Sequence, residues 1–413
     1  MPTTTLLGRA LMLIHTGQAP TRSMLTTGLG VTRATAGAVA AQLRDLGLIE
    51  IEAGPAPVPA SGAQGRPSHR LAVAPAGPVA VAAQLHQDGF GVALVGLGGQ
   101  VIAARSAHGP VPSDPELALR PLAEGAAALL RTSGRACAGA ALAVPAAVTS
   151  AEGTAVGAHY LGWPTGTKVR TIFGSLLRDH GVGVKCEAVN DTNALALAEY
   201  RHGAGAGSKA LLVLEAPRQG VGSALMLDGA LYTGSTGLGM EAGHVSVNSG
   251  GLPCGCGNRG CLSVEADAAR FMTLLGKSPD AGDSSTPGPL LDQAMTIIRT
   301  RYAADSGVRA AVAVLIDRLS LGLAGLINTL NPDRVLLGGL HAELLSAAPD
   351  LFRAEVAERS PWGRGAGVPI DRCVLADGVL VGAAEVAWEP VLANPALLSG
   401  PVASLPAGPA ATP

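Results

Sequence analysis

Four side chains that bind transition metals occur within one short stretch of this 413-residue chain. They are one histidine and three cysteines: His244, Cys254, Cys256 and Cys261. One imidazole and three thiolates complete a tetrahedral zinc site with no position left for water, which favours a structural over a catalytic metal. The glycines between the cysteines let the backbone turn tightly enough to aim three sulfurs at one ion. The spacing predicts a structural Zn²⁺ site; the alternative is a group of unligated buried thiols.

The other three cysteines, Cys137, Cys186 and Cys373, stand alone in apolar surroundings and are expected to be small buried hydrophobic residues. Clustered cysteines in a cytosolic chain indicate metal binding rather than disulfides. The N-terminus contains no basic segment followed by an apolar core, and we find no run of eighteen apolar residues free of charges and helix breakers. We therefore expect a cytoplasmic protein without a membrane partner.

An α/β body must carry the cluster, because strand-length apolar runs alternate with longer helical stretches from Val79 onward. The predicted strands are Val79–Ala83, Val92–Leu97, Ala140–Val144, Leu211–Leu214 and Val335–Gly338. The predicted helices are Pro115–Thr132, Val169–His180 and Asn193–His202, followed by a mostly helical segment from Ala266 to Leu330. Hydrophobic residues make up 48% of the chain and charged residues 15%, which is enough apolar material for two or three domains.

The first seventy residues predict a helix-turn-helix, with helices Thr21–Thr27 and Thr32–Leu46 on either side of the turn Gly28–Val31. The Thr32 hydroxyl can cap the second helix by accepting a hydrogen bond from a backbone N–H. Its apolar face repeats at i, i+4 and i+7 and consists of Val39, Leu43 and Leu46. Gly47 follows the last apolar position, as is typical of a left-handed helix end.

The opposite face of the second helix is small and basic: Arg33, Ala34, Gly37, Ala41 and Arg44. Such a face can enter a major groove and meet phosphates or base edges. Strands at Leu48–Glu52 and His69–Val73, joined by a glycine-rich loop (Gly54–Gly65), predict a wing tipped by Arg66. Six arginines against three carboxylates give residues 1–72 a net charge of +3, while the remainder carries −5. The alternative is an ordinary three-helix domain with surface arginines.

Taken together, these motifs resemble the ROK family, which unites bacterial repressors and sugar kinases. The most specific element is the Glu-x-Gly-His pattern at Glu241, followed by Cys-x-Cys-Gly-x-x-Gly-Cys ending at Cys261. The other matching motifs are the Gly30–Thr35 run, Gly47-Leu48-Ile49, Gly65-Arg66-Pro67, Leu161-Gly162-Trp163, Asn190-Asp191-x-Asn193, Asp228-Gly229, Asn331-Pro332 and Gly338-Gly339. The resemblance implies an α/β fold with an N-terminal winged helix-turn-helix followed by an actin-like (ribonuclease H-like), two-lobed sugar-kinase-type body, and a homodimer or homotetramer. We expect domains at 1–75, 76–195 and 196–390, and a loose tail at 391–413.

The resemblance also implies a sugar site. In family sugar kinases, the aspartate matching Asp191 is the general base that activates the sugar hydroxyl, and a carboxylate suits that role because it can accept the proton. Residues matching Asn190, Glu241 and His244 hold sugar hydroxyls, His244 with one ring nitrogen on the metal. Without this context, Asp191 would be a carboxylate at a helix N-terminus. Where the family usually has a sugar-contacting glutamate this chain has Ser263, so either Glu265 takes over the contact or the ligand differs.

Two departures from the family pattern concern phosphate binding. The kinases open with an Asp-x-Gly-Gly-Thr turn that cradles ATP phosphates, whereas the matching stretch here is Gln84-Leu85-His86-Gln87-Asp88. The family's Gly-Thr-Gly loop corresponds to Arg218-Gln219-Gly220. Bulky side chains fill the space that phosphates need, and Asp88 would repel them, so we expect no kinase activity. A third departure, Ala146 in place of a family glycine, bears on the shape of the pocket.

The sequence therefore predicts a DNA-binding transcriptional regulator, specifically a repressor, whose body senses a sugar or sugar derivative. The residues expected to contact operator DNA are Arg22, Thr32, Arg33, Gly37, Arg44 and Arg66. Two alternatives stay open: an ATP-dependent sugar kinase fused to a DNA-binding domain, and a ligand-independent regulator whose pocket is a relic.

Overall fold

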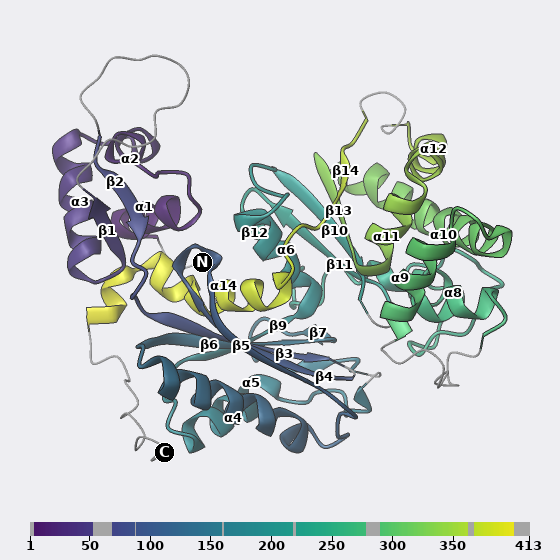
Figure 1. The fold of residues 1–413 in the computed structure, drawn as a ribbon, viewed down its shortest axis with the longest axis horizontal. Helices are drawn as coiled ribbons and strands as arrows, with labels where there is room; N and C mark the ends of the chain where they lie inside the picture. Colours follow the sequence, from purple (N-terminus) through teal and green to yellow (C-terminus); the bar gives the residue numbers. More distant parts are fainter. Residues whose placement is uncertain are drawn as a thin grey trace. The chain divides into compact units, whose positions relative to one another are not determined.

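The computed structural model describes residues 4–52, 68–86, 88–158, 161–217, 220–277, 290–361 and 367–399. The chain forms two compact units, each assembled from segments that are separate in sequence. The first unit comprises Met1–Ala143, Lys168–Val189 and Val379–Pro413, and the second comprises Val144–Thr167 and Asn190–Gly378. Figure 1 shows the elements of both.

The N-terminal part of the first unit is a helix-turn-helix with two strands, as predicted. It contains α1 (Leu6–His15), α2 (Arg22–Leu29), α3 (Arg33–Asp45) and the antiparallel strands β1 (Ile49–Glu52) and β2 (Arg70–Val73). The loop Gly54–Gly65 and Arg66 lie outside the described residues. Thr21 forms an isolated bridge with Arg70, which joins the start of α2 to β2.

Local chemistry explains the ends of α3. The Thr32 hydroxyl accepts a hydrogen bond from the Thr35 N–H at 3.2 Å, which confirms the predicted cap. Gly47, just after the helix, has a φ of +70°, the left-handed conformation that favours glycine. The buried face consists of Ala36, Val39, Ala40 and Leu43. Leu46 is only partly buried, because α3 ends at Asp45 and Leu46 is its cap residue.

The rest of the first unit is built on a five-stranded sheet in the order β5-β4-β3-β6-β9. Its strands are β3 (Val79–His86), β4 (Gly89–Gly96), β5 (Val101–His108), β6 (Cys137–Val144) and β9 (Cys186–Asn190). Figure 1 shows α4 (Pro115–Ser133) and α5 (Val169–Asp179) on one face and α14 (Gly378–Ala393) on the other. Covering both faces explains why β3, β4 and β6 are buried along nearly their whole length.

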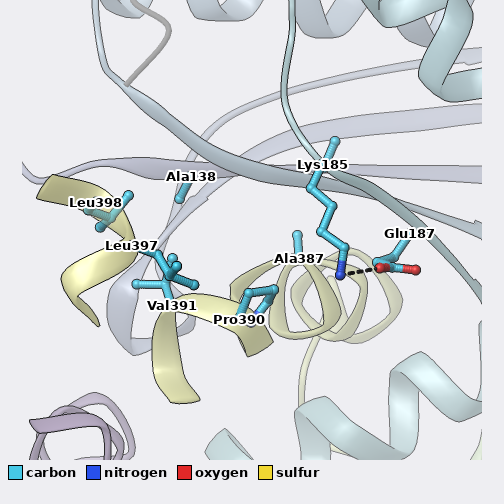
Figure 2. A pocket seen from close by; sticks show the side chains of 9 residues that line it. Ala138, Lys185, Glu187, Ala387, Pro390, Val391, Leu397 and Leu398 are labelled. Carbon is cyan, nitrogen blue, oxygen red and sulfur yellow. Dashed lines mark ion pairs between the residues drawn. The ribbon is translucent and has the colours of Figure 1, made fainter. Parts of the chain in front are cut away.

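Helix α14 and the short η4 (Pro395–Ser399) close over the sheet. The Trp388 indole Nε1–H donates to the Val95 carbonyl at 3.2 Å. A cavity of about 190 Å³ remains beside the helix, lined by apolar side chains and by the Lys185–Glu187 ion pair of 2.8 Å (Figure 2). Its lining residues are Ala138, Ala140, Lys185, Glu187, Ala387, Pro390, Val391, Leu397 and Leu398.

The second unit contains another five-stranded sheet, in the order β12-β11-β10-β13-β14. Its strands are β10 (Ala210–Ala216), β11 (Gly222–Leu227), β12 (Ala230–Leu231), β13 (Arg334–Gly338) and β14 (Ile370–Arg372), and a separate pair consists of β7 (Ala147–Val148) and β8 (Ala155–Val156). Its helices are α6 (Asp191–His202), α7 (Leu262–Glu265), α8 (Ala268–Leu274), α9 (Leu290–Arg301), α10 (Ser306–Leu330), α11 (Gly339–Ala347) and α12 (Pro349–Arg359). The strands and helices confirm the predicted α/β class.

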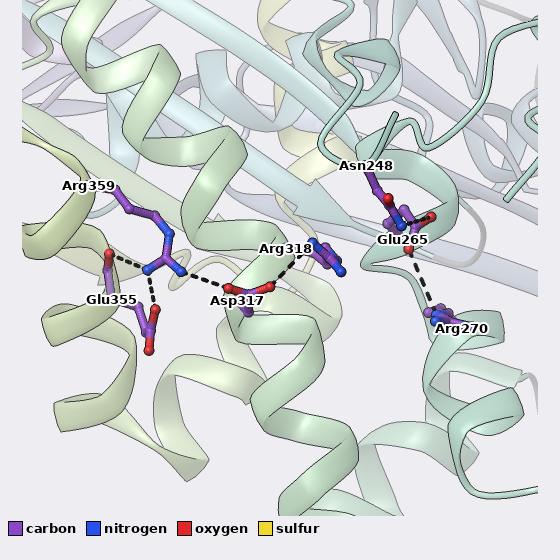
Figure 3. A network of polar contacts seen from close by, with 7 residues as sticks. All are labelled: Asn248, Glu265, Arg270, Asp317, Arg318, Glu355 and Arg359. Carbon is purple, nitrogen blue, oxygen red and sulfur yellow. Dashed lines mark hydrogen bonds and ion pairs between the residues drawn. The ribbon is translucent and has the colours of Figure 1, made fainter. Parts of the chain in front are cut away.

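Helix α10 forms the centre of this unit's core. Its buried residues include Leu315, Leu319 and Leu323, all of them fully inaccessible to solvent. Among the helices described, it alone has the length and composition to cross a membrane, yet more than half of its apolar stretch is buried against the rest of the protein. Arg359 joins α12 to α10 by bonding Asp317 at 2.7 Å (Figure 3). This ion pair is partly exposed, so it contributes about 1 kcal/mol or less.

Candidate metal centre and ligand site

The predicted zinc ligands converge in the second unit. One ligand atom from each of His244, Cys254, Cys256 and Cys261 lies within 4.8 Å of all the others. The Cys254 sulfur is 3.6 Å from His244 Nδ1, and the sulfurs of Cys256 and Cys261 are 3.7 Å apart. A tetrahedral zinc with Zn–S of about 2.3 Å and Zn–N of about 2.0 Å requires separations of about 3.6 Å and about 3.8 Å for such pairs. The residues therefore fit a zinc ion.

Backbone hydrogen bonds fold the loop that carries these ligands. His244 ends the short η3 (Ala242–His244), and Cys261 is the residue before α7. The Cys254 N–H donates to the Asn258 carbonyl at 2.8 Å, which closes a tight turn between the cysteines. Gly260 has a φ of +63°, and a Cβ there would lie 1.6 Å from the Asn248 carbonyl oxygen. Only glycine can occupy this position, so this glycine is needed for the ligand geometry.

The thiols differ in how readily they ionise. Cys261 is buried, and burial raises the pKa of its thiol. Cys256 is exposed, and a backbone hydrogen bond from Asn258 lowers the pKa of its thiol. A metal would have to displace the proton from the buried thiol, and thiolate coordination would supply the free energy for that.

The residues predicted to contact a sugar lie in the same unit, at the start of α6. Asn190 is the cap of this helix: its Oδ1 accepts from the Asn193 N–H at 3.0 Å, and its Nδ2 donates to Asp191 Oδ1 at 3.1 Å. The Asp191 side chain also accepts from the Thr192 N–H at 2.8 Å. The helix begins at Asp191, two residues before the predicted start, because the Asn190 side chain caps it.

Asp191 is 8% exposed, and burial raises its pKa to about 6, with the nearby Glu241 carboxylate adding to the shift. Glu241 itself is exposed, although partial burial still raises its pKa. Neither carboxylate forms an ion pair with another described residue. Asp191 is hydrogen-bonded by Asn190 and Thr192 but faces no positive charge among these residues, so a polar ligand with hydroxyl or cationic groups would add partners for both carboxylates.

Glu215, at the end of β10, is a residue that sequence reasoning missed. Burial and the neighbouring Asp191 raise its pKa to about 8, and its Oε2 has no hydrogen-bond partner among the described residues. It pairs across the sheet with Gly222 and Gly338, and a Cβ at Gly338 would lie 2.9 Å from the Glu215 side chain. A glutamate directly after the apolar run Leu211–Leu214 was the available signal.

The first residues of β11 lie between Glu215 and the segment that leads into the metal loop, which we define as residues His244 to Cys261. The Ser223 hydroxyl donates to the Met240 carbonyl and accepts from the Ala242 N–H at 3.1 Å, so it holds the backbone on both sides of Glu241. Met240 has a φ of +67°, a strained conformation for a methionine that is common at functional sites. The His244 N–H donates to the Glu241 carbonyl at 3.0 Å, so β11 supports the backbone of one predicted ligand contact and of the predicted metal ligand His244.

Glu265 and Ser263 are both buried and both engaged. Glu265 Oε1 accepts from the Leu252 N–H at 2.9 Å and from Asn248 Nδ2 at 3.2 Å, and Arg270 lies 4.0 Å from its Oε2 (Figure 3). Glu265 therefore braces the metal loop, while its predicted sugar contact stays a prediction. The Ser263 hydroxyl accepts from the Val221 N–H at 3.1 Å and so supports the loop before β11.

Among the residues predicted to contact DNA, Arg22 lies on α2, while Arg33, Gly37 and Arg44 lie on α3, which Thr32 caps. Arg33 and Arg44 are exposed on α3, and Arg44 pairs with Asp45 at 2.7 Å. A Cβ at Gly37 would lie 3.7 Å from a terminal nitrogen of Arg22, so this guanidinium lies across α3 at its smallest residue. Arg66, like Gln87, Arg218 and Gln219 of the predicted phosphate loops, is outside the described residues.

Comparisons with known proteins place the chain in a family. A sequence model described as the ROK family matches residues 85–358. A glucokinase of Thermotoga maritima is 34% identical over 162 residues, which are 38% of this chain and 51% of the relative. The DNA-binding transcriptional dual regulator NagC of Escherichia coli is 30% identical over 159 residues, 38% of each protein. The chain thus spans about half, or less, of the length of these relatives.

The fold extends the similarity over almost the entire chain. The solved structure of a ROK family transcriptional regulator, a homologue of the E. coli MLC protein, superposes with a TM-score of 0.72 and 21% sequence identity. The superposition covers 95% of this chain and 98% of that one. It confirms the predicted actin-like α/β fold preceded by a winged helix-turn-helix. Because the family model also matches most of the sequence, this chain belongs to the ROK family.

Proposed function

We propose that this chain is a DNA-binding transcriptional repressor whose body binds a sugar or sugar derivative without phosphorylating it. The observation that carries the proposal is a winged helix-turn-helix joined to a ROK body: the family model begins only at residue 85, whereas the regulator fold covers 95% of the chain. Residues 1–75 are the proposed DNA-binding domain. Sequence similarity to NagC, a DNA-binding protein, supports the same conclusion.

Operator recognition requires two copies of the N-terminal helix-turn-helix domain (hereafter the head) on one DNA duplex. A homodimer or homotetramer would present two copies of α3 to half-sites about one helical turn apart. We expect the full chain to select a palindrome from a randomised duplex library, with weaker binding at higher salt because arginines replace counterions. Failure to enrich any duplex would refute DNA recognition.

The ligand half rests on Asn190, Asp191, Glu241 and His244. The Glu241 carboxylate is close enough to Asp191 to raise its pKa, and the His244 N–H donates to the Glu241 carbonyl. The helix that starts with Asp191 is also bonded, further along, to the segment before α14. The fully buried Glu199 of α6 accepts from the Val374 and Leu375 N–H groups at 2.6 and 2.9 Å. A ligand at the first turn of α6 could thus act on this segment, provided that it binds one state more tightly than the other.

Thermal unfolding with a panel of sugars and phosphosugars tests ligand binding directly. A ligand at a hundred times its Kd should add about 2.7 kcal/mol to the stability. The same ligand should then release the selected operator in a gel shift. Absence of any response to the panel would refute the sensing half and favour the ligand-independent alternative, as would unchanged induction in cells after replacement of Asp191 and Glu241.

We infer that Zn²⁺ is the resident metal of the His/Cys site and that its role is structural. Bound zinc would fix the loop and the orientation of the His244 ring. Because the DNA-binding head is formed by other residues, chelation should impair ligand response before it impairs operator binding. A cytoplasmic location fits reduced thiols at this site.

A sugar kinase is the second candidate, favoured by the similarity to a glucokinase and by a buried Asp191 whose pKa of about 6 suits a general base. The bulky residues in both stretches that match the kinases' phosphate-binding loops argue against a kinase. An ADP-release assay with hexoses and aminosugars separates the two. Turnover of about 1 s⁻¹ or faster would establish the kinase.

A further inference from the structure

A buried histidine connects the helix-turn-helix to the body of the first unit. His15 is the last residue of α1, and Glu385 lies 370 positions later in α14. His15 Nε2 is 3.0 and 2.9 Å from the two Glu385 oxygens, and both side chains are fully inaccessible to solvent. Buried polar groups need hydrogen-bond partners, so this bond ties the end of α1 to α14.

The second ring nitrogen settles which atom carries the proton. The Gly98 N–H, in the turn after β4, donates to His15 Nδ1 at 2.8 Å. Nδ1 therefore accepts, and the proton of the neutral imidazole is on Nε2, where it is donated to Glu385. His15 thus bonds two separate elements of the body at once, and both bonds depend on its ring orientation.

The other end of α1 is attached to the same helix. The Thr5 N–H and its hydroxyl both donate to the Ala393 carbonyl, each at 3.1 Å. A Cβ at Gly8 would lie 2.3 Å from that carbonyl oxygen, so only glycine permits this approach. Glu385 and Ala393 are about 12 Å apart along α14, at about 1.5 Å per residue. Attachment at both ends fixes the direction of α1 as well as its position.

Helix α14 is itself seated on the sheet, and α1 is packed on the other head helices. Trp388 bonds Val95, and a Cβ at Gly139 would lie 2.8 Å from the Ala387 carbonyl oxygen. On the head side, a Cβ at Gly28 would lie 2.9 Å from the Leu13 side chain. The contacts therefore run without a break from the first sheet through α14 and α1 to the helix-turn-helix.

We propose that His15 and Glu385 are positioning residues for DNA recognition, which hold α3 at a fixed orientation to the first sheet and so set the half-site spacing of the operator. The inference rests on the proposed DNA-binding function. A head tied to the body only by a flexible linker would accept a range of spacings, because each head could reorient at little cost. A head whose orientation to the first sheet is fixed can bind only half-sites at the separation that the arrangement of the bodies sets.

The test measures binding of the full-length protein to a series of duplexes. They carry the two halves of the selected palindrome with one to five base pairs inserted between them. The main variant is the double replacement His15→Leu/Glu385→Leu, because apolar substitution of a buried pair preserves folding better than removal of one partner. His341→Leu is the matched control, since His341 is equally buried but lies in the second unit.

We expect the wild type and His341→Leu to lose at least tenfold in affinity on the first insertions. The double variant should bind the best duplex about tenfold more weakly and vary less than threefold across the series. His15→Gln, which can keep both a donor and an acceptor, should restore part of the spacing preference. A spacing profile as sharp as that of the wild type would overturn the proposal, and so would an equal loss at every spacing.

A second measurement does not require DNA. In hydrogen exchange, the amides of Leu6–His15 should exchange at least tenfold faster in the double variant, while those of Ser306–Leu330 keep their rates. If the wild type selects no duplex, the proposed DNA-binding function is refuted, but hydrogen exchange still tests whether the His15–Glu385 pair holds α1 in place. Unchanged protection of α1 would show that the pair does not hold the head.

Discussion

Replacing Asp191 by asparagine should stabilise the unliganded protein at neutral pH and abolish its response to ligand. The folded state raises the pKa of Asp191 from 3.8 to about 6, chiefly by burial. A carboxyl whose pKa is raised binds its proton more tightly in the folded state, so its contribution to stability is greatest below pH 4. That contribution declines as the pH rises from about 4 to about 6 and is then constant.

The size of the effect follows from the shift. About two pKa units at about 1.4 kcal/mol each amount to about 3 kcal/mol of destabilisation from ionised Asp191 at pH 7.5. Asparagine is nearly isosteric and can still accept from the Thr192 N–H, so Asp191→Asn should recover most of this free energy. For a unit of this size, the gain corresponds to a rise in Tm of roughly 6–12 °C.

Thermal unfolding followed between pH 4 and pH 7.5 measures the gain as a function of pH. It should be largest above pH 6 and nearly vanish at pH 4. Asp305→Asn is the matched control of opposite sign, because backbone hydrogen bonds from the start of α10 lower the pKa of Asp305. That variant should lose stability at pH 7.5. A gain for Asp191→Asn that is independent of pH, or a loss at pH 7.5, would refute the reasoning.

Three further predictions concern other residues. Glu215→Gln should also stabilise the protein at pH 9, because burial raises the pKa of this carboxyl to about 8 and the folded protein then holds an ionised, buried carboxylate. The gain should shrink as the pH falls below 8 and disappear towards pH 4. A loss of stability at pH 9 would contradict this. Cys261→Ser should reduce bound zinc, measured by elemental analysis, from one ion per chain to well below half, whereas Cys137→Ser, a buried thiol outside the cluster, should leave it unchanged; full zinc content in the first variant would rule Cys261 out as a ligand. Arg33→Ala should lower the slope of log K against log salt by about 0.9 for operator binding, while Arg120→Ala on α4 should not change it; equal slopes would remove Arg33 from the DNA interface.

Features encoded by neighbouring residues could be predicted from the sequence. The caps of α3, its glycine terminator and the alternation of strands and helices depend on residues within a few positions of each other. The convergence of His244 with three cysteines was predictable for a related reason, because tight glycine turns leave a short segment few ways to place four ligands.

The tertiary structure alone decided which distant groups became partners. The residues around Glu215 in the sequence do not predict that β10 ends beside the first turn of α6. The hydrogen-bond partners of Glu265, which are Asn248 and the Leu252 N–H, are likewise determined only by the fold. The His15–Glu385 pair spans 370 positions. Local propensities fix elements through short-range sterics and hydrogen bonds, whereas burial, pKa shifts and long-range pairing arise only when packing removes water from groups that the sequence keeps apart.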